Sequence, residues 1–179
     1  MIKKFFGSKK GLLKYFYYNT MCFVFRRYGH LNVIPANIGR VVFVCKGNIC
    51  RSPLAHVVFQ LNSRLPVASF GLDTTTGCPA HPPIIFQSKL QGYDLSNHLT
   101  TSVVDFKPQE NDLYVCTEIH HVDGLKKIIN TDRIILLGLF ADSKRAYIHD
   151  PYNTGSEYTS MIVSYIIAST KKLASKLEA

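Results

Sequence analysis

The most constraining feature of the sequence is a strand-like run that leads through a short loop into a helix marked by proline. Residues 41–44 read Val-Val-Phe-Val, a β-branched and aromatic run typical of a strand buried on both faces. A loop from Cys45 to Ser52 follows, and Pro53 fits the first turn of a helix predicted over residues 53–61. This order opens a βαβ unit and predicts that the loop lies at the carboxyl edge of a parallel sheet.

The rest of the chain alternates between strand-like and helix-like segments. Strands are predicted over residues 67–70, 112–115 and 133–137, with helices over residues 83–91 and 118–129. A long final helix carries apolar residues at helical spacing from Tyr158 to Leu173, and Thr154 with Glu157 fits a capping box at its start. The alternation predicts a parallel sheet with helices on both faces.

Length and charge divide the chain into two parts. With 179 residues, 46% of them hydrophobic, the chain suits one compact domain. The net charge of +9 lies mainly in residues 1–40, which hold eight Lys and Arg residues and no acid. We therefore expect a basic, aromatic extension over residues 1–39 and a nearly neutral domain over residues 40–179. A domain without a broad basic surface is not expected to bind nucleic acid.

Cysteine usage and hydropathy bear on the location of the protein. The chain has five cysteines, which is an odd number and a lower density than in small domains stabilised by disulfides. This favours reduced thiols and a cytoplasmic location. No apolar run approaches the roughly 18–20 residues that a spanning helix needs. The apolar stretch in the extension is followed by Arg26 and Arg27 and by no small-residue cleavage site, so we expect the extension to be retained.

The residue types of the loop point to a phosphate-like anion. Backbone N–H groups of such a loop and the helix N-terminus behind it attract negative charge, and the same field favours a nucleophilic thiolate at Cys45. Arg51 supplies a planar fork for phosphoryl oxygens, and Ser52 is placed to hydrogen-bond the sulfur. Gly47 permits close backbone approach, and Asn48 tolerates a left-handed conformation.

Two plainer interpretations of the cysteines stay open at this point. Cys45 and Cys50 are also compatible with small buried apolar residues near a strand end. They also have the spacing of half a zinc site, although no second pair at metal spacing follows in the sequence.

Residues 41–53 resemble the phosphate-binding loop of the low-molecular-weight protein tyrosine phosphatases, and the resemblance extends over residues 40–175. It implies a flavodoxin-like four-stranded parallel sheet, with the phosphate-binding loop after the first strand. It also implies a phosphocysteine intermediate on Cys45 and no metal or cofactor. The phosphate-binding positions are Lys46, Gly47, Asn48, Ile49, Cys50, Arg51 and Ser52. In this family an aspartate before a proline acts as general acid, and Asp150, in His149-Asp150-Pro151-Tyr152, matches it.

The resemblance also implies roles outside the loop. Ser69 and His98 match residues that hydrogen-bond the loop asparagine, and Tyr152 matches the aromatic residue beside the phosphotyrosine ring. Cys50 matches a second cysteine that traps oxidised Cys45 as a disulfide. Bacterial members of the family often act on autophosphorylated tyrosine kinases of polysaccharide export, which implies such a kinase as partner.

Other functions are compatible with parts of the sequence. Arsenate reductase of the same fold needs two closely spaced relay cysteines, whereas Cys78 and Cys116 are far apart in the sequence. Protein-arginine phosphatases carry threonine at the position of Ile49. A non-catalytic phosphopeptide-binding module has no need of a thiol or a proton donor. A peripheral membrane contact through residues 1–30 is compatible with their cations and aromatic residues, although Gly7 and Gly11 disfavour a helix there.

Overall fold

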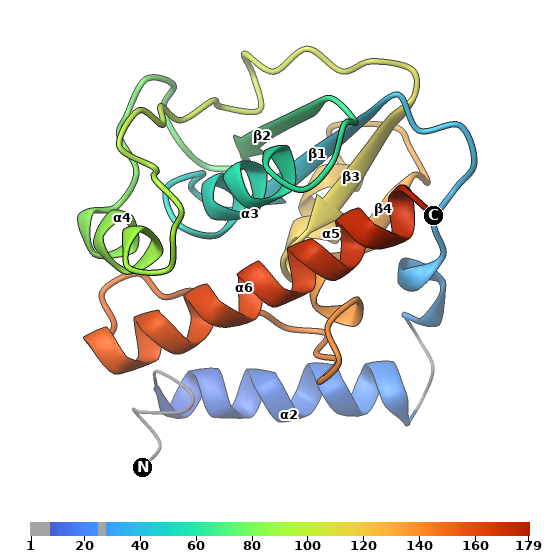
Figure 1. Ribbon diagram of the computed structural model, residues 1–179. Helices are drawn as coiled ribbons and strands as arrows, with labels where there is room; N and C mark the ends of the chain where they lie inside the picture. The colour runs from blue at the N-terminus through green and yellow to red at the C-terminus, as the bar shows by residue number, and fades with distance from the viewer. Residues whose placement is uncertain (1–7, 25–27) are drawn as a thin grey trace.

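The computed structural model describes residues 8–24 and 28–179 and contains a four-stranded parallel sheet (Figure 1). The strands stand in the order β2-β1-β3-β4, and every neighbouring pair is parallel. They are β1 (Arg40–Cys45), β2 (Val67–Gly71), β3 (Asp112–Cys116) and β4 (Ile134–Leu136). The predicted fold class is confirmed, and each of these strands lies within a residue or two of its predicted bounds.

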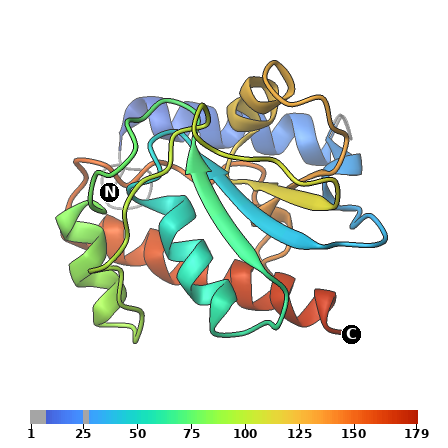
Figure 2. The ribbon, with the colours of Figure 1, turned by 90° about the horizontal axis from the view of Figure 1, so that it is seen from above.

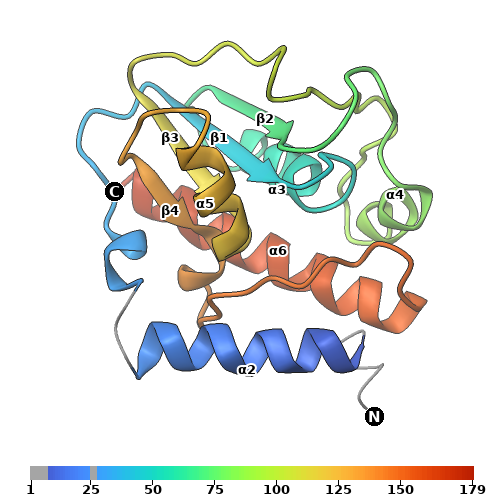
Figure 3. The same ribbon diagram turned by 180° about the vertical axis from the view of Figure 1, so that it is seen from behind.

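Helices cover both faces of the sheet, as Figures 2 and 3 show. One face carries α3 (Arg51–Gln60) and α6 (Ser156–Leu177), and α4 (Pro82–Lys89) packs against α6. The other face carries α5 (Ile119–Lys126) together with α2 (Lys9–Phe23). Two short 3₁₀ helices, η1 (Gly29–Asn32) and η2 (Leu137–Leu139), lie before β1 and after β4. None of the described helices is long and apolar enough to cross a membrane.

The central position of β1 explains its sequence. It is flanked by β2 and β3 and sandwiched between helices, so residues 41–45 are all buried. Its first residue, Arg40, stays near the surface, where its guanidinium makes two hydrogen bonds of 2.8 and 2.7 Å to the carboxylate of Asp112. Because parallel strands run in one direction, the carboxyl ends of β1, β2 and β3 meet at one edge.

The predicted capping box of the last helix is wrong by one residue. The residue that caps α6 is Gly155, so Thr154 and Glu157 are out of register for the reciprocal bonds of a capping box. The Thr154 hydroxyl instead donates a 2.7 Å hydrogen bond to the Pro151 carbonyl. Thr154 therefore closes the turn that follows Asp150, rather than starting the helix.

The N-terminal segment forms a helix despite its glycine. Ser8 caps α2 by accepting a 2.9 Å hydrogen bond from the Gly11 amide, and Gly11 is buried against the rest of the protein. The helix thus forms although glycine has a low helix propensity, and Gly11 lies on its buried face. Other residues named for this segment, Gly7, Arg26 and Arg27, lie outside the described residues.

Candidate active site

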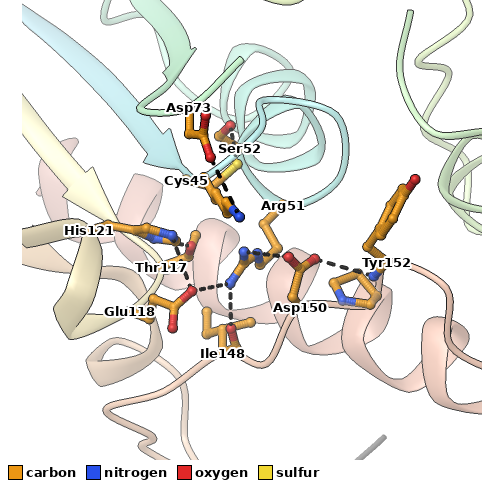
Figure 4. Close-up of polar contacts among 12 residues, drawn as sticks. Cys45, Arg51, Ser52, Asp73, Thr117, Glu118, His121, Ile148, Asp150 and Tyr152 are labelled. Atoms are coloured by element: carbon orange, nitrogen blue, oxygen red, sulfur yellow. Dashed lines mark hydrogen bonds and ion pairs between the residues drawn. The ribbon is translucent and has the colours of Figure 1, made fainter. Parts of the chain in front are cut away.

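The loop after β1 encloses the sulfur of Cys45 (Figure 4). The Asn48 amide lies 3.2 Å from Sγ of Cys45, and the Ser52 hydroxyl lies 3.0 Å from it. The helix α3 begins directly after the loop, so its unpaired N–H groups point toward the same space. Hydrogen-bond donors are thus gathered around the buried sulfur.

Close packing against β2 holds this loop in place. A Cβ atom added at Gly71, the last residue of β2, would come within 2.8 Å of the Lys46 carbonyl and 2.9 Å of the Asn48 amide nitrogen. Glycine is thus the residue that lets the loop backbone lie directly on the strand end.

Asn48 is the centre of the hydrogen-bond network under the loop. Its backbone has the predicted left-handed conformation, with φ of 51°. Its side-chain NH₂ donates to Ser52 at 2.8 Å and to Ser69 at 3.1 Å, while its side-chain oxygen accepts from the Thr101 amide at 2.9 Å. Ser52 accepts this hydrogen bond and keeps its own hydroxyl hydrogen available for a thiolate at Cys45.

Two histidines complete this network. His98 Nε2 lies 2.8 Å from the Asn48 carbonyl, which only accepts, so Nε2 carries the proton. Burial lowers the pKa of His98 and keeps the ring neutral at pH 7. His56 Nδ1 lies 3.3 Å from the Ser69 hydroxyl, and burial, followed by the influence of His98, lowers the pKa of His56 to about 4. The structure thus brings Ser69, His98 and Thr101 to the loop asparagine, and His56 to Ser69.

Arg51 is a fully buried cation whose partners surround it on two sides. One terminal nitrogen donates to Glu118 at 2.8 Å and to the Ile148 carbonyl at 3.0 Å, and the other lies 3.1 Å from the Asp150 carboxylate. Burial would lower the pKa of Arg51, but Asp150 and Glu118 outweigh it and the net shift is upward. The buried Nε has no partner among the described residues, so it is available to an anion.

Glu118 is a site residue for which the sequence suggested no role. Its carboxylate contacts both Arg51 and Nε2 of His121, the latter at 3.1 Å. Burial would raise the pKa of Glu118, but the His121 hydrogen bond and the charge of Arg51 hold it well below its usual range. Nδ1 of His121 lies 3.0 Å from the Thr117 hydroxyl. Glu118 therefore stays ionised and orients the guanidinium.

Asp150 lies at the mouth of a cavity of about 240 Å³ that has Cys45 and Arg51 at its base. Its side chain is 41% exposed, and its second oxygen accepts a 3.2 Å hydrogen bond from the Tyr152 amide. The Tyr152 ring lines the cavity, is half exposed and lies beside His81 with 4.8 Å between ring centroids.

The remaining loop residues line the same cavity. Gly47, Ile49 and Cys50 contribute to its wall. Lys46 lies at the rim, where its ammonium group is 3.5 Å from the exposed carboxylate of Asp73. Cys50 is buried, and burial raises the pKa of its thiol, which is therefore protonated at pH 7. Among the described residues, no three His, Cys, Asp or Glu side chains are grouped so that they could hold a metal ion.

Comparison of the sequence with known proteins agrees with this geometry. Residues 40–179 match the family model described as low molecular weight phosphotyrosine protein phosphatase. The low molecular weight protein-tyrosine-phosphatase Wzb of Salmonella typhi is 29% identical over 143 residues, covering 78% of this chain and 95% of the relative. The low molecular weight phosphotyrosine protein phosphatase of Gallus gallus is 30% identical over 126 residues, covering 63% of this chain and 78% of the relative.

A solved structure agrees with the sequence matches. The tyrosine phosphatase Wzb from Escherichia coli K30, crystallised in complex with sulphate, superposes with a TM-score of 0.70 and 26% identity. The superposition covers 79% of this chain and 99% of the relative. The sheet and the loop after its first strand therefore belong to a fold that this relative shares.

The depressed pKa of His56 predicts a stability change in mild acid. Unfolding restores a histidine pKa of about 6.5. Between pH 6.5 and 4, His56 therefore binds a proton in the unfolded chain but not in the folded chain. This group's contribution, about 3 kcal/mol, is present above pH 6.5 and is lost as the pH falls toward 4. Urea unfolding at pH 7, 5.5 and 4.5 measures it.

The variant His56→Gln isolates that contribution. It should lose less stability than the wild type between pH 7 and 4.5, whereas the exposed control His30→Gln should follow the wild type. Equal losses in His56→Gln and the wild type would show that His56 does not titrate as described.

Proposed function

The chain belongs to the low molecular weight phosphotyrosine protein phosphatase family and is a hydrolase of phosphotyrosine, and we propose that Cys45, Arg51 and Asp150 carry out the reaction. The observation that carries this proposal is the convergence of the three side chains on one cavity. We assign the phosphatase domain to residues 40–179 and treat residues 1–39 as an extension.

In the first step, the Cys45 thiolate attacks the phosphorus atom of phosphotyrosine. The S–P bond forms as the P–O bond to the tyrosyl ring breaks, and the Asp150 carboxyl group gives its proton to the departing phenolate oxygen. The 3.0 Å contact with Ser52 and the Asn48 amide stabilise the sulfur as attacking group and, in the second step, as leaving group.

In the second step, water hydrolyses the phosphocysteine. The Asp150 carboxylate takes a proton from the attacking water, the new P–O bond forms, and the S–P bond breaks to release inorganic phosphate and the thiolate. Throughout, Arg51 binds the equatorial phosphoryl oxygens through its free Nε and the terminal nitrogen that faces Asp150. Loop amides from residues 46–52 bind the same oxygens.

The lining of the cavity favours a phosphorylated tyrosine over a phosphorylated arginine. Ile49 is half-buried in the wall and offers no polar atom to a guanidinium leaving group. Tyr152 offers an aromatic face to a tyrosyl ring. The partner we propose is a phosphotyrosine protein, in particular an autophosphorylated tyrosine kinase of polysaccharide export, as the family resemblance implies.

Substitution at the nucleophile and at the acid tests the proposal. With a phosphotyrosine peptide, Cys45→Ser should abolish turnover, and Asp150→Asn should lower kcat/KM by about 10²- to 10⁴-fold because the proton donor is lost. The exposed carboxylate of Asp142 pairs with Lys172 on the surface, so Asp142→Asn is a matched control that should keep wild-type rates. Release of inorganic phosphate measures each rate.

The same assay with a phosphoarginine peptide compares the two substrate classes. The wild type should hydrolyse the phosphotyrosine peptide faster. Undiminished turnover by Cys45→Ser, or preference for phosphoarginine, would refute the assignment.

We also propose a peripheral membrane contact through the outer face of α2. This face carries the exposed side chains of Leu13, Phe16 and Tyr17, opposite the buried Gly11, Tyr18 and Cys22, and the exposed Val24 follows at the end of the helix. Lys9 and Lys10 are exposed beside it, and residues 1–40 contain no acidic residue. Apolar area flanked by cations is complementary to an anionic bilayer surface.

Vesicle co-sedimentation of the full chain tests this contact. The protein should sediment with phosphatidylcholine vesicles that contain phosphatidylglycerol, more weakly at high salt, and Leu13→Ser with Phe16→Ser should reduce the bound fraction. The control pair Leu61→Ser with Val104→Ser removes comparably exposed apolar side chains elsewhere and should bind like the wild type. Equal binding by both pairs would rule out α2 as the contact.

A further inference from the structure

The segment that leads to Asp150 lies between the active site and α2. Figures 1 and 3 both show the connection from η2 to α6 passing between α2 and α6. On its inner side, the Ile148 amide donates to the Thr117 carbonyl at 3.1 Å, and the Ile148 carbonyl accepts from Arg51 at 3.0 Å. The side of this segment that faces the active site is therefore hydrogen-bonded to Thr117, after β3, and to Arg51, at the start of α3.

The outer side of the same segment is tied to α2. Asn19, on the helix, accepts a 3.0 Å hydrogen bond from the backbone amide of Ala146, which is 1% exposed. The Asn19 side chain is itself fixed, since its NH₂ group donates to the Tyr15 carbonyl at 2.8 Å. A buried amide needs a partner, so Asn19 determines where the backbone lies at Ala146.

Tyr18 links α2 to α5 and to the segment that leads to Asp150. Its hydroxyl lies 2.5 Å from Nε2 of His120 on α5, and its ring lies 5.7 Å from the ring of Tyr147. Tyr147 pairs with Glu118 through an isolated β-bridge, and Glu118 holds Arg51. Arg145 lies over the Tyr15 ring at 5.7 Å, which adds a contact at the start of the segment.

From these contacts we propose that Asn19 and Tyr18 are positioning residues for the general acid. This inference rests on the proposed role of Asp150. Proton donation requires the carboxyl group within hydrogen-bond reach of the leaving oxygen, so a displaced backbone at Ala146 reduces acid catalysis four residues later. The extension thus completes the active site from outside the part of the chain that matches the family model.

Dependence on the leaving group separates a positioning role from a merely structural one. Phenol, with a pKa of about 10 like tyrosine, needs a proton to depart, whereas 4-nitrophenol is more acidic and needs it less. Asn19→Ala should therefore lower kcat/KM for phenyl phosphate about tenfold and for 4-nitrophenyl phosphate less than about threefold. Inhibition by inorganic phosphate should be unchanged, because the Asn19 side chain bonds Tyr15 and Ala146 rather than the phosphate-binding loop.

Neighbouring and conservative variants provide the controls. Thr20 is exposed on the same helix, so Thr20→Ala should match the wild type with both substrates. Asn19→Asp keeps an oxygen that accepts from the Ala146 amide and should restore most of the rate. Tyr18→Phe removes the hydroxyl that contacts His120 and should shift the substrate ratio in the same direction as Asn19→Ala.

The double variant Asn19→Ala with Asp150→Asn distinguishes the two proposals. If Asn19 acts through Asp150, adding Asn19→Ala to Asp150→Asn should cost no further rate. Equal losses on both aryl phosphates in Asn19→Ala, or additive losses in the double variant, would overturn the positioning role. If Asp150→Asn alone lacks the leaving-group dependence, the proposed function itself fails.

Discussion

The structure depends on one buried positive charge at the edge of the sheet. Arg51 is 2% exposed, and a guanidinium so far from water is stable only when anionic and carbonyl oxygens surround it. Glu118 and the Ile148 carbonyl supply those oxygens on one side, and Asp150 supplies them on the side that faces the cavity. The same charge therefore organises the end of β3, the segment before α6 and the binding site for a phosphoryl group.

A second constraint is the rigidity of the loop around Cys45. Asn48 is fully buried in a left-handed conformation, and three hydrogen bonds of its side chain fix the loop to Ser52, Ser69 and Thr101. A loop fixed in this way holds its donors toward the sulfur before substrate arrives, so little reorganisation is needed in the transition state. Neutral histidines suit this network, since His98 donates to the loop and His56 lies within hydrogen-bond distance of Ser69.

The sequence predicted the features that depend on neighbouring residues, and it did not predict contacts between segments that lie far apart in the chain. The run at residues 41–44 and the loop after it predicted the strand, the helix and the position of Cys45, because these features depend on neighbouring residues. The contact between Glu118 and Arg51 depends on β1 lying beside β3, which no local pattern encodes. Likewise, the register of α6 and the packing of α2 through Gly11 follow from tertiary contacts rather than from helix propensity.

The central claim is that a phosphoryl group passes through the sulfur of Cys45. Rapid acid quenching of the wild-type protein during turnover of a phosphotyrosine peptide, followed by peptide mass spectrometry, tests it most directly. We expect a phosphorylated peptide in which the modification lies on Cys45 and disappears as substrate is exhausted. A phosphoryl group on another residue, or steady release of inorganic phosphate with no phosphorylated cysteine at any time, would contradict it.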